Sequence, residues 1–252
     1  MLKILLSGVG GAMGHTLQSA IADDPECQIV AGFDLNTDQN TPFPIYSDLT
    51  LCTEKADVII DFSHFKAFDG IFNYAKATKT PIVIATTGLS DQNMADIQVA
   101  SQNFPIFKTA NMSLGINILA RALKEMSGVL EDTFDIEIIE KHHNKKVDAP
   151  SGTALLLADA VNDGLNTKKE YTYGREGRDC KRQVNELGIH AIRGGTIAGE
   201  HTVLFAGNDE LIEVKHTALS KKVFANGALK AAKYLVTKDL GLYDMQDVIN
   251  TL

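Results

Sequence analysis

The chain opens with a short apolar run that leads directly into a glycine-rich turn and then into a helical pattern. Residues 2–6 are mostly apolar, residues 7–14 read SGVGGAMG, and apolar residues follow at Leu17, Ala20 and Ile21. A strand, a glycine turn and a helix in this order are typical of the first unit of a dinucleotide-binding fold. Glycines let the backbone approach a pyrophosphate, and Gly14 allows close packing of helix on strand. The pattern therefore predicts a nucleotide-binding turn; a glycine turn that binds nothing is the alternative.

A second apolar run, residues 29–33, ends at Asp34, which lies about 20 residues after the last glycine of the turn. An acidic side chain at this place can accept a hydrogen bond from a ribose hydroxyl. Further apolar runs follow at 58–62, 81–85 and 105–107, with a helical pattern at 65–77. This alternation predicts an α/β fold with a Rossmann-like, doubly wound parallel sheet.

Ligands of such sheets bind at the carboxyl ends of the strands. We therefore expect cofactor contacts in the glycine turn, after the second strand and in the loops after the later strands. The candidate residues are Gly8, Val9, Gly10, Gly11, Ala12, Met13, Asp34, Ala85, Thr86, Thr87, Thr109, Ala110, Asn111 and Met112. Thr86 and Thr87 fit a helix cap equally well, and Asn111 fits a turn.

The pattern changes in the second half of the chain. One clear helix, at 154–161, lies among strand-like runs at 136–140, 189–192, 201–206 and 211–216. This mixture predicts a second α+β domain for substrate binding and oligomerisation. A last helix, 224–235, is expected to return to the first domain, so the predicted domains are 1–112 with 223–252, and 113–222. Residues 162–186 are polar without periodicity, and both a flexible loop and a subunit contact fit them.

Residues 140–153, EKHHNKKVDAPSGT, place two imidazoles and three ammonium groups just before a helix start. The backbone N–H groups of residues 151–153 and the helix dipole favour a carboxylate or phosphate there. His142 and His143 titrate near neutral pH, and a partly desolvated Lys146 can act as an acid. The segment predicts an anion site with a proton donor; a solvated basic loop is the alternative. His201 and His216 are expected to be ordinary hydrogen-bonded strand residues.

Charge and cysteine content narrow the class of protein. A net charge of −8 disfavours general binding to nucleic acid or acidic membranes. No apolar run approaches the roughly 20 residues that a membrane span needs. Three scattered cysteines, and two adjacent histidines without helical zinc spacing, argue against a disulfide framework or a metal site. We expect a cytoplasmic protein that binds a small anion, with no metal, nucleic acid or membrane partner.

Five segments together resemble the dihydrodipicolinate reductase family, also called 4-hydroxy-tetrahydrodipicolinate reductase. Residues 140–153 are similar to the family signature E-x-H-H-x-x-K-x-D-A-P-S-G-T. The other four segments are GVGGAMG at 8–14, ANMS at 110–113, GEH at 199–201 and FANGA at 224–228. The resemblance covers almost the whole chain and implies a two-domain, homotetrameric oxidoreductase of diaminopimelate and lysine biosynthesis.

By this resemblance, NADH and/or NADPH reduces 4-hydroxy-tetrahydrodipicolinate to tetrahydrodipicolinate, with His142 and Lys146 as catalytic residues and Lys146 as proton donor. The dicarboxylate substrate is implied to bind at His143, Ser151, Gly152 and Thr153. Another two-domain dehydrogenase and a non-catalytic nucleotide-binding protein are the alternatives, because a fold alone does not define a function. The intact His142 and Lys146 favour the reductase.

The nucleotide preference follows from a departure from the family pattern. Family members that use NADPH usually carry an arginine in the glycine turn and another after the acid of the second strand. This chain has Ala12 in the turn, and Leu35 and Asn36 after Asp34. Asp34 would repel a 2′-phosphate and would bond a free ribose hydroxyl. We therefore expect NADH preference or dual use, unless a cation from elsewhere in the chain reaches the phosphate.

Overall fold

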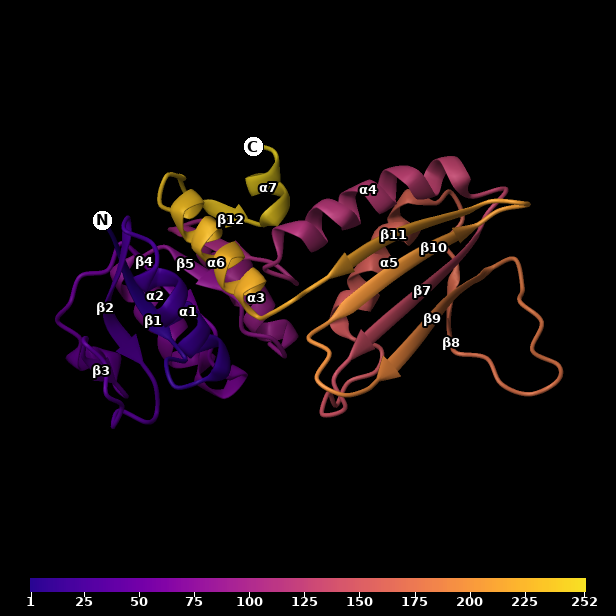
Figure 1. Ribbon diagram of the computed structural model, residues 1–252. Helices are drawn as coiled ribbons and strands as arrows, with labels where there is room; N and C mark the ends of the chain where they lie inside the picture. Colours follow the sequence, from indigo (N-terminus) through magenta and orange to yellow (C-terminus); the bar gives the residue numbers. More distant parts are fainter. The chain divides into compact units, whose positions relative to one another are not determined.

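The computed structural model describes residues 1–252 and divides the chain into two compact units (Figure 1). Unit 1 comprises Met1–Leu114 and Lys221–Leu252, and unit 2 comprises Gly115–Ser220. The chain therefore leaves unit 1 once and returns to it for its last helices. The sequence-based boundaries, at 112 and 223, differ from these by two residues at each junction.

Unit 1 contains a parallel sheet of seven strands in the order β12-β6-β5-β4-β1-β2-β3. Its strands are β1 (Leu2–Ser7), β2 (Cys27–Phe33), β3 (Ile45–Tyr46), β4 (Val58–Asp61), β5 (Ile82–Ile84), β6 (Pro105–Lys108) and β12 (Gly241–Tyr243). Its helices are α1 (Ala12–Ala22), α2 (Phe68–Thr78), α3 (Asp91–Ala100), α6 (Lys222–Leu235) and α7 (Met245–Ile249), with short 3-10 turns η1 (Leu49–Leu51) and η2 (Phe65–Ala67). The predicted Rossmann-like fold is confirmed.

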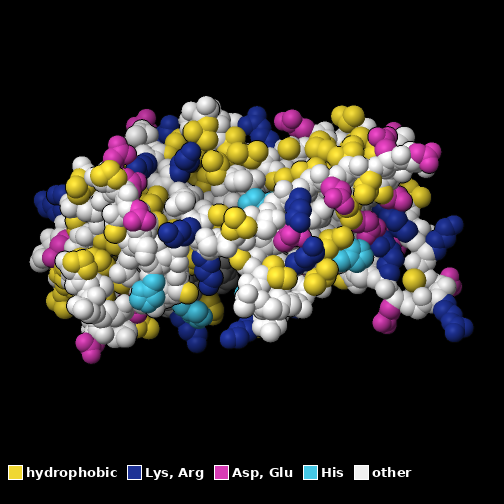
Figure 2. Space-filling view, in the orientation of Figure 1, with side chains coloured by type: hydrophobic (Ala, Val, Ile, Leu, Met, Phe, Trp, Pro, Cys, Tyr) yellow, Lys and Arg dark blue, Asp and Glu magenta, His cyan; other side chains and the backbone are white.

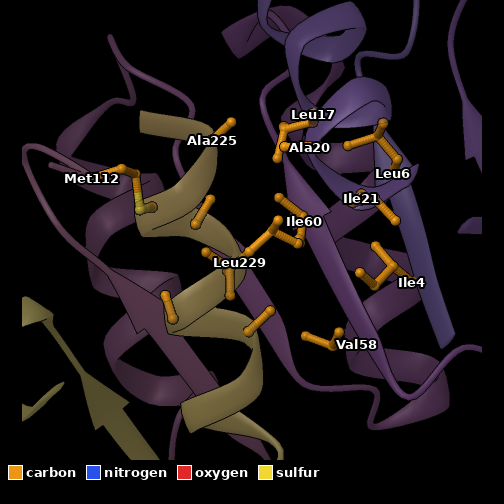
Figure 3. Packing of buried hydrophobic residues seen from close by; sticks show 14 of the residues in the cluster. Ile4, Leu6, Leu17, Ala20, Ile21, Val58, Ile60, Met112, Ala225 and Leu229 are labelled. Atoms are coloured by element: carbon orange, nitrogen blue, oxygen red, sulfur yellow. The ribbon is translucent and has the colours of Figure 1, made fainter. Parts of the chain in front are cut away.

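Both faces of this sheet are buried, which explains why its central strands read as continuous apolar runs. Ile4 and Leu6 of β1 pack with residues of α1 and α6, whereas Leu5 between them packs on the opposite face with α2 and α3. Figure 3 shows the first of these clusters, in which Leu229 of α6 lies near Ile60 of β4. The helix expected to return to the first domain thus completes its core.

Unit 2 contains a mixed sheet of five strands in the order β11-β10-β7-β9-β8. Its strands are β7 (Asp135–His142), β8 (Glu170–Tyr173), β9 (Glu186–Arg193), β10 (Glu200–Ala206) and β11 (Leu211–Thr217), and its helices are α4 (Leu114–Leu130) and α5 (Gly152–Gly164). Strand β7 pairs in parallel with β9 and antiparallel with β10. The even-numbered residues of β7 are buried, and they begin with Ile136 and Ile138 in the hydrophobic core. The predicted α+β character of this part is confirmed.

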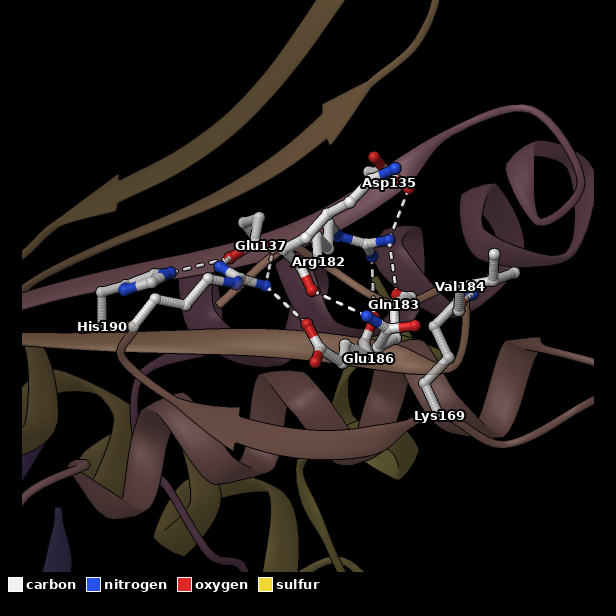
Figure 4. A network of polar contacts seen from close by, with 10 residues as sticks. Asp135, Glu137, Lys169, Arg182, Gln183, Val184, Glu186 and His190 are labelled. Carbon is white, nitrogen blue, oxygen red and sulfur yellow. Dashed lines mark hydrogen bonds and ion pairs between the residues drawn. The ribbon is translucent and has the colours of Figure 1, made fainter. Parts of the chain in front are cut away.

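Two elements of unit 2 were not predicted, namely α4 and β8. Strand β8 lies in the polar segment 162–186, which has no apolar periodicity. Ion pairs attach this segment to the sheet. Figure 4 shows part of this network, in which Glu137 of β7 accepts from Arg182 at 3.1 Å and from His190 at 2.7 Å. Arg175 also binds Glu137, at 2.8 and 2.9 Å. Because Arg175 and Arg182 both lie in segment 162–186, the network ties this segment to the sheet of its own unit.

The outer surface carries charged side chains of both signs among hydrophobic ones. In the view of Figure 2, basic and acidic side chains lie beside one another over the strands of unit 2. One such group joins Lys141, Glu200 and Lys215, with Lys215 Nζ 2.7 Å from a Glu200 carboxylate oxygen. No helix of the structure has the length and apolar composition needed to cross a membrane.

Candidate active site

The glycine turn between β1 and α1 leaves no room for a side chain at Gly8 or Gly14. Gly8 has a positive φ of 82°, and a β-carbon there would lie 2.7 Å from the Phe62 carbonyl oxygen. A β-carbon on Gly14 would lie 2.2 Å from the Gly8 carbonyl oxygen, so only glycine permits this approach of helix to turn. Helix α1 begins without a side-chain cap on its first N–H groups. Those N–H groups can bind an anion at this turn.

Asp34 follows β2 and lies directly beside the glycine turn. Its carboxylate accepts a hydrogen bond from the Gly10 N–H at 2.8 Å and another from the Asn36 N–H at 3.1 Å. Gln39 also reaches this turn, because a β-carbon on Gly10 would lie only 2.8 Å from its side-chain nitrogen. Gln39 was missed in the sequence analysis, since a polar residue in a loop carries no motif. The arrangement suits a ribose held next to a diphosphate.

The loops after β4 and β5 are joined by the buried carboxylate of Asp61. Asp61 accepts from the Thr86 hydroxyl at 2.6 Å and from the Ser63 N–H at 3.1 Å. Thr86 is 2% exposed, so its side chain lies in the protein interior. Met112 is likewise buried, with its side chain in the core shown in Figure 3. Thr86 and Met112, like the fully buried Val9, can therefore offer a cofactor backbone atoms only, whereas Thr87 is exposed.

Lys108, at the end of β6, was also missed in the sequence analysis. Its ammonium group lies 3.5 Å from the Thr86 carbonyl oxygen. Burial lowers the pKa of Lys108, although the charge of Asp61 acts in the opposite direction. A lysine at the last position of an apolar strand carries no signal that separates it from a surface residue.

In unit 2, His142 is held by a fully buried carboxylate. Glu140, two residues earlier on the same face of β7, accepts from His142 Nδ1 at 2.6 Å. Arg193 of β9 pairs with His142 in the sheet register and binds both Glu140 oxygens at 2.7 Å. Burial alone would raise the pKa of Glu140, but the bonds from Arg193, His142 and Ser151 outweigh it and lower the pKa. The His142 imidazole is therefore hydrogen-bonded to an ionised carboxylate.

Ser151 connects the start of α5 to a second histidine. Its hydroxyl oxygen accepts the Ala154 N–H at 3.2 Å as a helix cap and lies 2.9 Å from His201 Nε2. The rings of His201 and His142 meet edge to face, with centroids 5.1 Å apart. Burial, and after it the charge of His142, lower the pKa of His201 to about 4. His201 is thus a hydrogen-bonded strand residue, as expected, and it also packs against the candidate catalytic imidazole.

The remaining predicted residues of unit 2 lie in and after the turn that follows β7. His143 Nδ1 is buried without a hydrogen-bond partner in the protein, and a β-carbon on Gly152 would meet nothing within 4 Å. Lys146 Nζ lies 2.8 Å from Asp148. Burial opposes ionisation of Asp148, but the bond from Lys146 outweighs it and the pKa of Asp148 is lowered. Open space beside Gly152 and an unused donor or acceptor on His143 are features that a polar ligand would satisfy.

Glu140 and Arg193 were not assigned roles in the sequence analysis. Glu140 carries a signal, because alternation along a strand places it on the same face as His142. Arg193 carries none, since its contact with Glu140 spans 53 residues of sequence. No group of three or more His, Cys, Asp or Glu side chains is arranged to hold a metal ion.

The Rossmann-like sheet of unit 1, with a second mixed-sheet unit that carries a buried histidine–carboxylate cluster, is the architecture of a two-domain, nucleotide-dependent oxidoreductase. Comparison with known families makes the assignment specific. The model for the N-terminus of dihydrodipicolinate reductase matches residues 2–112, and the model for its C-terminus matches residues 115–249. The chain belongs to the dihydrodipicolinate reductase family, and the predicted resemblance is confirmed.

Relatives and solved structures agree with this assignment. The 4-hydroxy-tetrahydrodipicolinate reductase of Caldanaerobacter subterraneus subsp. tengcongensis is 51% identical over 99% of this chain and 98% of its own. That of Clostridium novyi is 48% identical over 100% of this chain and 99% of its own. A dipicolinate-bound dihydrodipicolinate reductase from a Paenisporosarcina species has the same fold, with a TM-score of 0.80, 20% identity and 97% of each chain covered. A myo-inositol dehydrogenase from Corynebacterium glutamicum, with a TM-score of 0.61, 13% identity and 99% and 93% coverage, shows that this fold also serves other dehydrogenases.

Proposed function

We propose that this chain catalyses the NAD(P)H-dependent reduction of 4-hydroxy-tetrahydrodipicolinate to tetrahydrodipicolinate, with loss of water, in diaminopimelate and lysine biosynthesis. The observation that supports this proposal is the Ser151-capped start of α5 in the same unit as the His142 imidazole, which is hydrogen-bonded to the Glu140 carboxylate. A relative that is 51% identical along its whole length bears the name of this reaction. The unit 1 fold alone would suit many dehydrogenases, so the unit 2 site decides between them.

The substrate carries two carboxylates, and unit 2 offers groups that can bind one of them. The N–H groups of Gly152 and Thr153 lie at the start of α5, where the helix dipole favours an anion. His143 supplies an unpaired buried nitrogen, and Ser151 caps the helix beside them. We assign Gly152, Thr153 and His143 to direct substrate binding and Ser151, whose N–H donates to Glu140, to the helix cap that positions them in the substrate site.

Lys146 and His142 are assigned to proton transfer. Loss of water from the 4-hydroxy ring leaves a carbon–carbon double bond conjugated with the imine, and a bound reduced nicotinamide would supply a hydride to the far carbon of that conjugated system. Electron density then develops on the ring nitrogen, where Lys146 donates a proton. His142 positions or recharges Lys146, and Asp148, 2.8 Å from Lys146 Nζ, holds that amine in place before reaction.

Unit 1 is assigned to the nucleotide and unit 2 to the substrate and to assembly. The diphosphate would bind at the glycine turn, and the nicotinamide in the loops that contain Ala85, Thr87, Thr109 and Ala110. NADH is the proposed preferred nucleotide, because the Asp34 carboxylate lies against Gly10 where a 2′-phosphate would be repelled. A homotetramer and a cytoplasmic location are proposed from the family resemblance.

The deciding experiment measures oxidation of NADH and NADPH separately, with substrate generated from pyruvate and aspartate semialdehyde by the preceding synthase. We expect turnover with both nucleotides and a kcat/KM for NADH at least equal to that for NADPH. The variant Asp34→Ala should raise the relative use of NADPH, because it removes the repelling charge. Asp38→Ala, which removes an exposed acid of the same loop, is the matched control.

Each outcome separates one part of the proposal from the others. Absence of turnover with either nucleotide would overturn the reaction. Strong NADPH preference by the unmodified chain would overturn the role of Asp34 and leave the reaction in place. Equal effects of the Asp34 and Asp38 variants would show that only the general charge of the loop matters.

A further inference from the structure

Glu140 contacts more of the unit 2 site than any assigned catalytic residue does. Its side chain is fully buried, and one of its oxygens accepts from His142 Nδ1 at 2.6 Å and from Arg193 Nη1 at 2.7 Å. The other accepts from the Ser151 N–H at 3.0 Å and from Arg193 Nη2 at 2.7 Å. Four donors match the four lone-pair positions of a carboxylate. Glu140, on strand β7, thus connects that strand to the start of α5 and to strand β9.

The donors around Glu140 decide which nitrogen of His142 carries a proton. An ionised carboxylate only accepts hydrogen bonds, so His142 Nδ1 must donate to it. The neutral ring then presents Nε2 as an acceptor on its other edge. That edge faces Gly199, where a β-carbon would lie 3.1 Å from Nε2. A glycine at position 199 therefore keeps the working edge of the ring clear.

We propose that Glu140 is the positioning residue of this site: it fixes the Nδ1–H tautomer of His142 and holds that ring in register with the start of α5. The proposal rests on the proton-transfer role proposed for His142. Arg193 holds Glu140 in place, because it binds both carboxylate oxygens. It also donates to the Asp148 carbonyl at 2.7 Å, two residues after Lys146. One buried acid thereby couples proton transfer to the substrate-binding helix.

The substitution Glu140→Gln preserves the size of the side chain and changes its hydrogen-bonding sense. The amide NH2 of the glutamine is a donor. When it faces His142 Nδ1, that nitrogen must accept, and it can accept only in the Nε2–H tautomer of the ring. In the Ser-His-Asp triad, an acid-to-amide change with intact geometry reduces turnover through this same reversal. Loss of an orienting partner behind a functional imidazole costs about 10-fold to 100-fold at metal sites, and we expect a decrease in kcat of that size here.

Three measurements on the full chain test the proposal. The first is the His142 tautomer, read from the ring-nitrogen NMR signals of labelled protein and assigned by comparison with His142→Gln. The second is kcat and KM, and the third is the affinity for dipicolinate, a planar dicarboxylate that requires no reaction. The matched control is Glu137→Gln, which removes a carboxylate of the same strand that also binds arginine and histidine, on the opposite sheet face.

The unmodified chain should show the Nδ1–H tautomer, and Glu140→Gln should show Nε2–H with kcat reduced and dipicolinate still bound. Glu137→Gln should leave tautomer and kcat unchanged, and Glu140→Asp, which keeps the charge, should retain the tautomer and exceed Glu140→Gln in turnover. An Nε2–H tautomer in the unmodified chain overturns the proposal without any variant. Equal turnover of the Asp and Gln variants, or an equal loss in Glu137→Gln, overturns it as well. Because the tautomer and dipicolinate binding need no turnover, failure of the proposed reaction would be recognised separately.

Discussion

At the scale of single residues, the proposed proton donor Lys146 is held by an ion pair. Its ammonium group is paired with Asp148 at 2.8 Å, and its side chain is 22% exposed. The Asp148 carboxylate restricts the position of the amine, and partial burial keeps the amine from full hydration. Lys145 beside it is exposed. The two adjacent lysines therefore differ in environment, and the one that the family signature singles out is the partly buried one.

We expect Lys146→Ala to lower kcat by about 100-fold or more, because general acid catalysis contributes a factor of this order. KM should change much less, since the substrate carboxylates are assigned to the start of α5. Steady-state kinetics with saturating nucleotide measures both constants. Lys145→Ala is the control and should keep the kcat of the unmodified chain. Unmodified turnover in Lys146→Ala would remove this lysine from the mechanism.

At the scale of elements, helix α6 approaches the loop after β6 more closely than any side chain permits. A β-carbon on Gly227 would lie 1.7 Å from the Met112 carbonyl oxygen, which is a backbone atom that cannot rotate away. The helix also fills the core with Ala225, Ala228, Ala231 and Ala232, all fully buried. Small residues thus bring α6 close to the loop that contains Asn111, a proposed cofactor contact.

Gly227→Ala should destabilise unit 1, because overpacking of a tight contact costs about 1–3 kcal/mol or more. Gly70, in the first turn of α2, is the matched control, since a β-carbon there meets only Phe33 at 3.6 Å. Gly70→Ala should be neutral or stabilising by about 0.4–1 kcal/mol. Denaturant unfolding of both variants measures the difference, and equal stabilities would contradict the contact.

At the scale of the whole molecule, stability should depend on pH in two separate ranges. Burial lowers the pKa of His201 to about 4, and it lowers the pKa of His216 as well. Arginine and histidine partners outweigh burial to lower the pKa of Glu137 to about 2, and the pKa of Glu140 is lowered too. In every case the unfolded chain binds protons more readily than the folded chain, so acid favours unfolding. The histidines lower the free energy of unfolding as the pH falls from about 6.5 to 4, and the carboxylates lower it below about pH 4.5.

The free energy of unfolding should therefore fall as the pH is lowered from about 6.5 towards 4, with a contribution from His201 of up to about 3 kcal/mol. The contribution is fully present above pH 6.5. His201→Gln should flatten the dependence in this range, whereas His15→Gln, at an exposed site, should keep it. Denaturant titrations at a series of pH values measure the slopes. An unchanged slope in His201→Gln would show that this histidine takes up its proton in the folded protein.

Short-range patterns in the sequence were sufficient to predict most strands of unit 1 and the start of α5. The glycine turn, Asp34 and the cap at Ser151 depend on neighbouring residues, since turn geometry and helix starts are local properties. Strand β8 and helix α4 were missed. For β8 the reason is physical: arginines from a polar segment bind Glu137 on another strand, and no local periodicity records that contact.

The sequence by itself determined the class of fold, the start of α5 and the candidates His142 and Lys146, because each is encoded within a few neighbouring residues. Only the tertiary structure decided which groups surround them. Sheet register places Arg193 opposite His142 and His201 opposite Glu140. These partners are distant along the chain, and the pairing of β7 with β9 and β10 is a property of the whole sheet rather than of any segment. The hydrogen-bonded setting of His142 therefore became visible only once the strands were aligned.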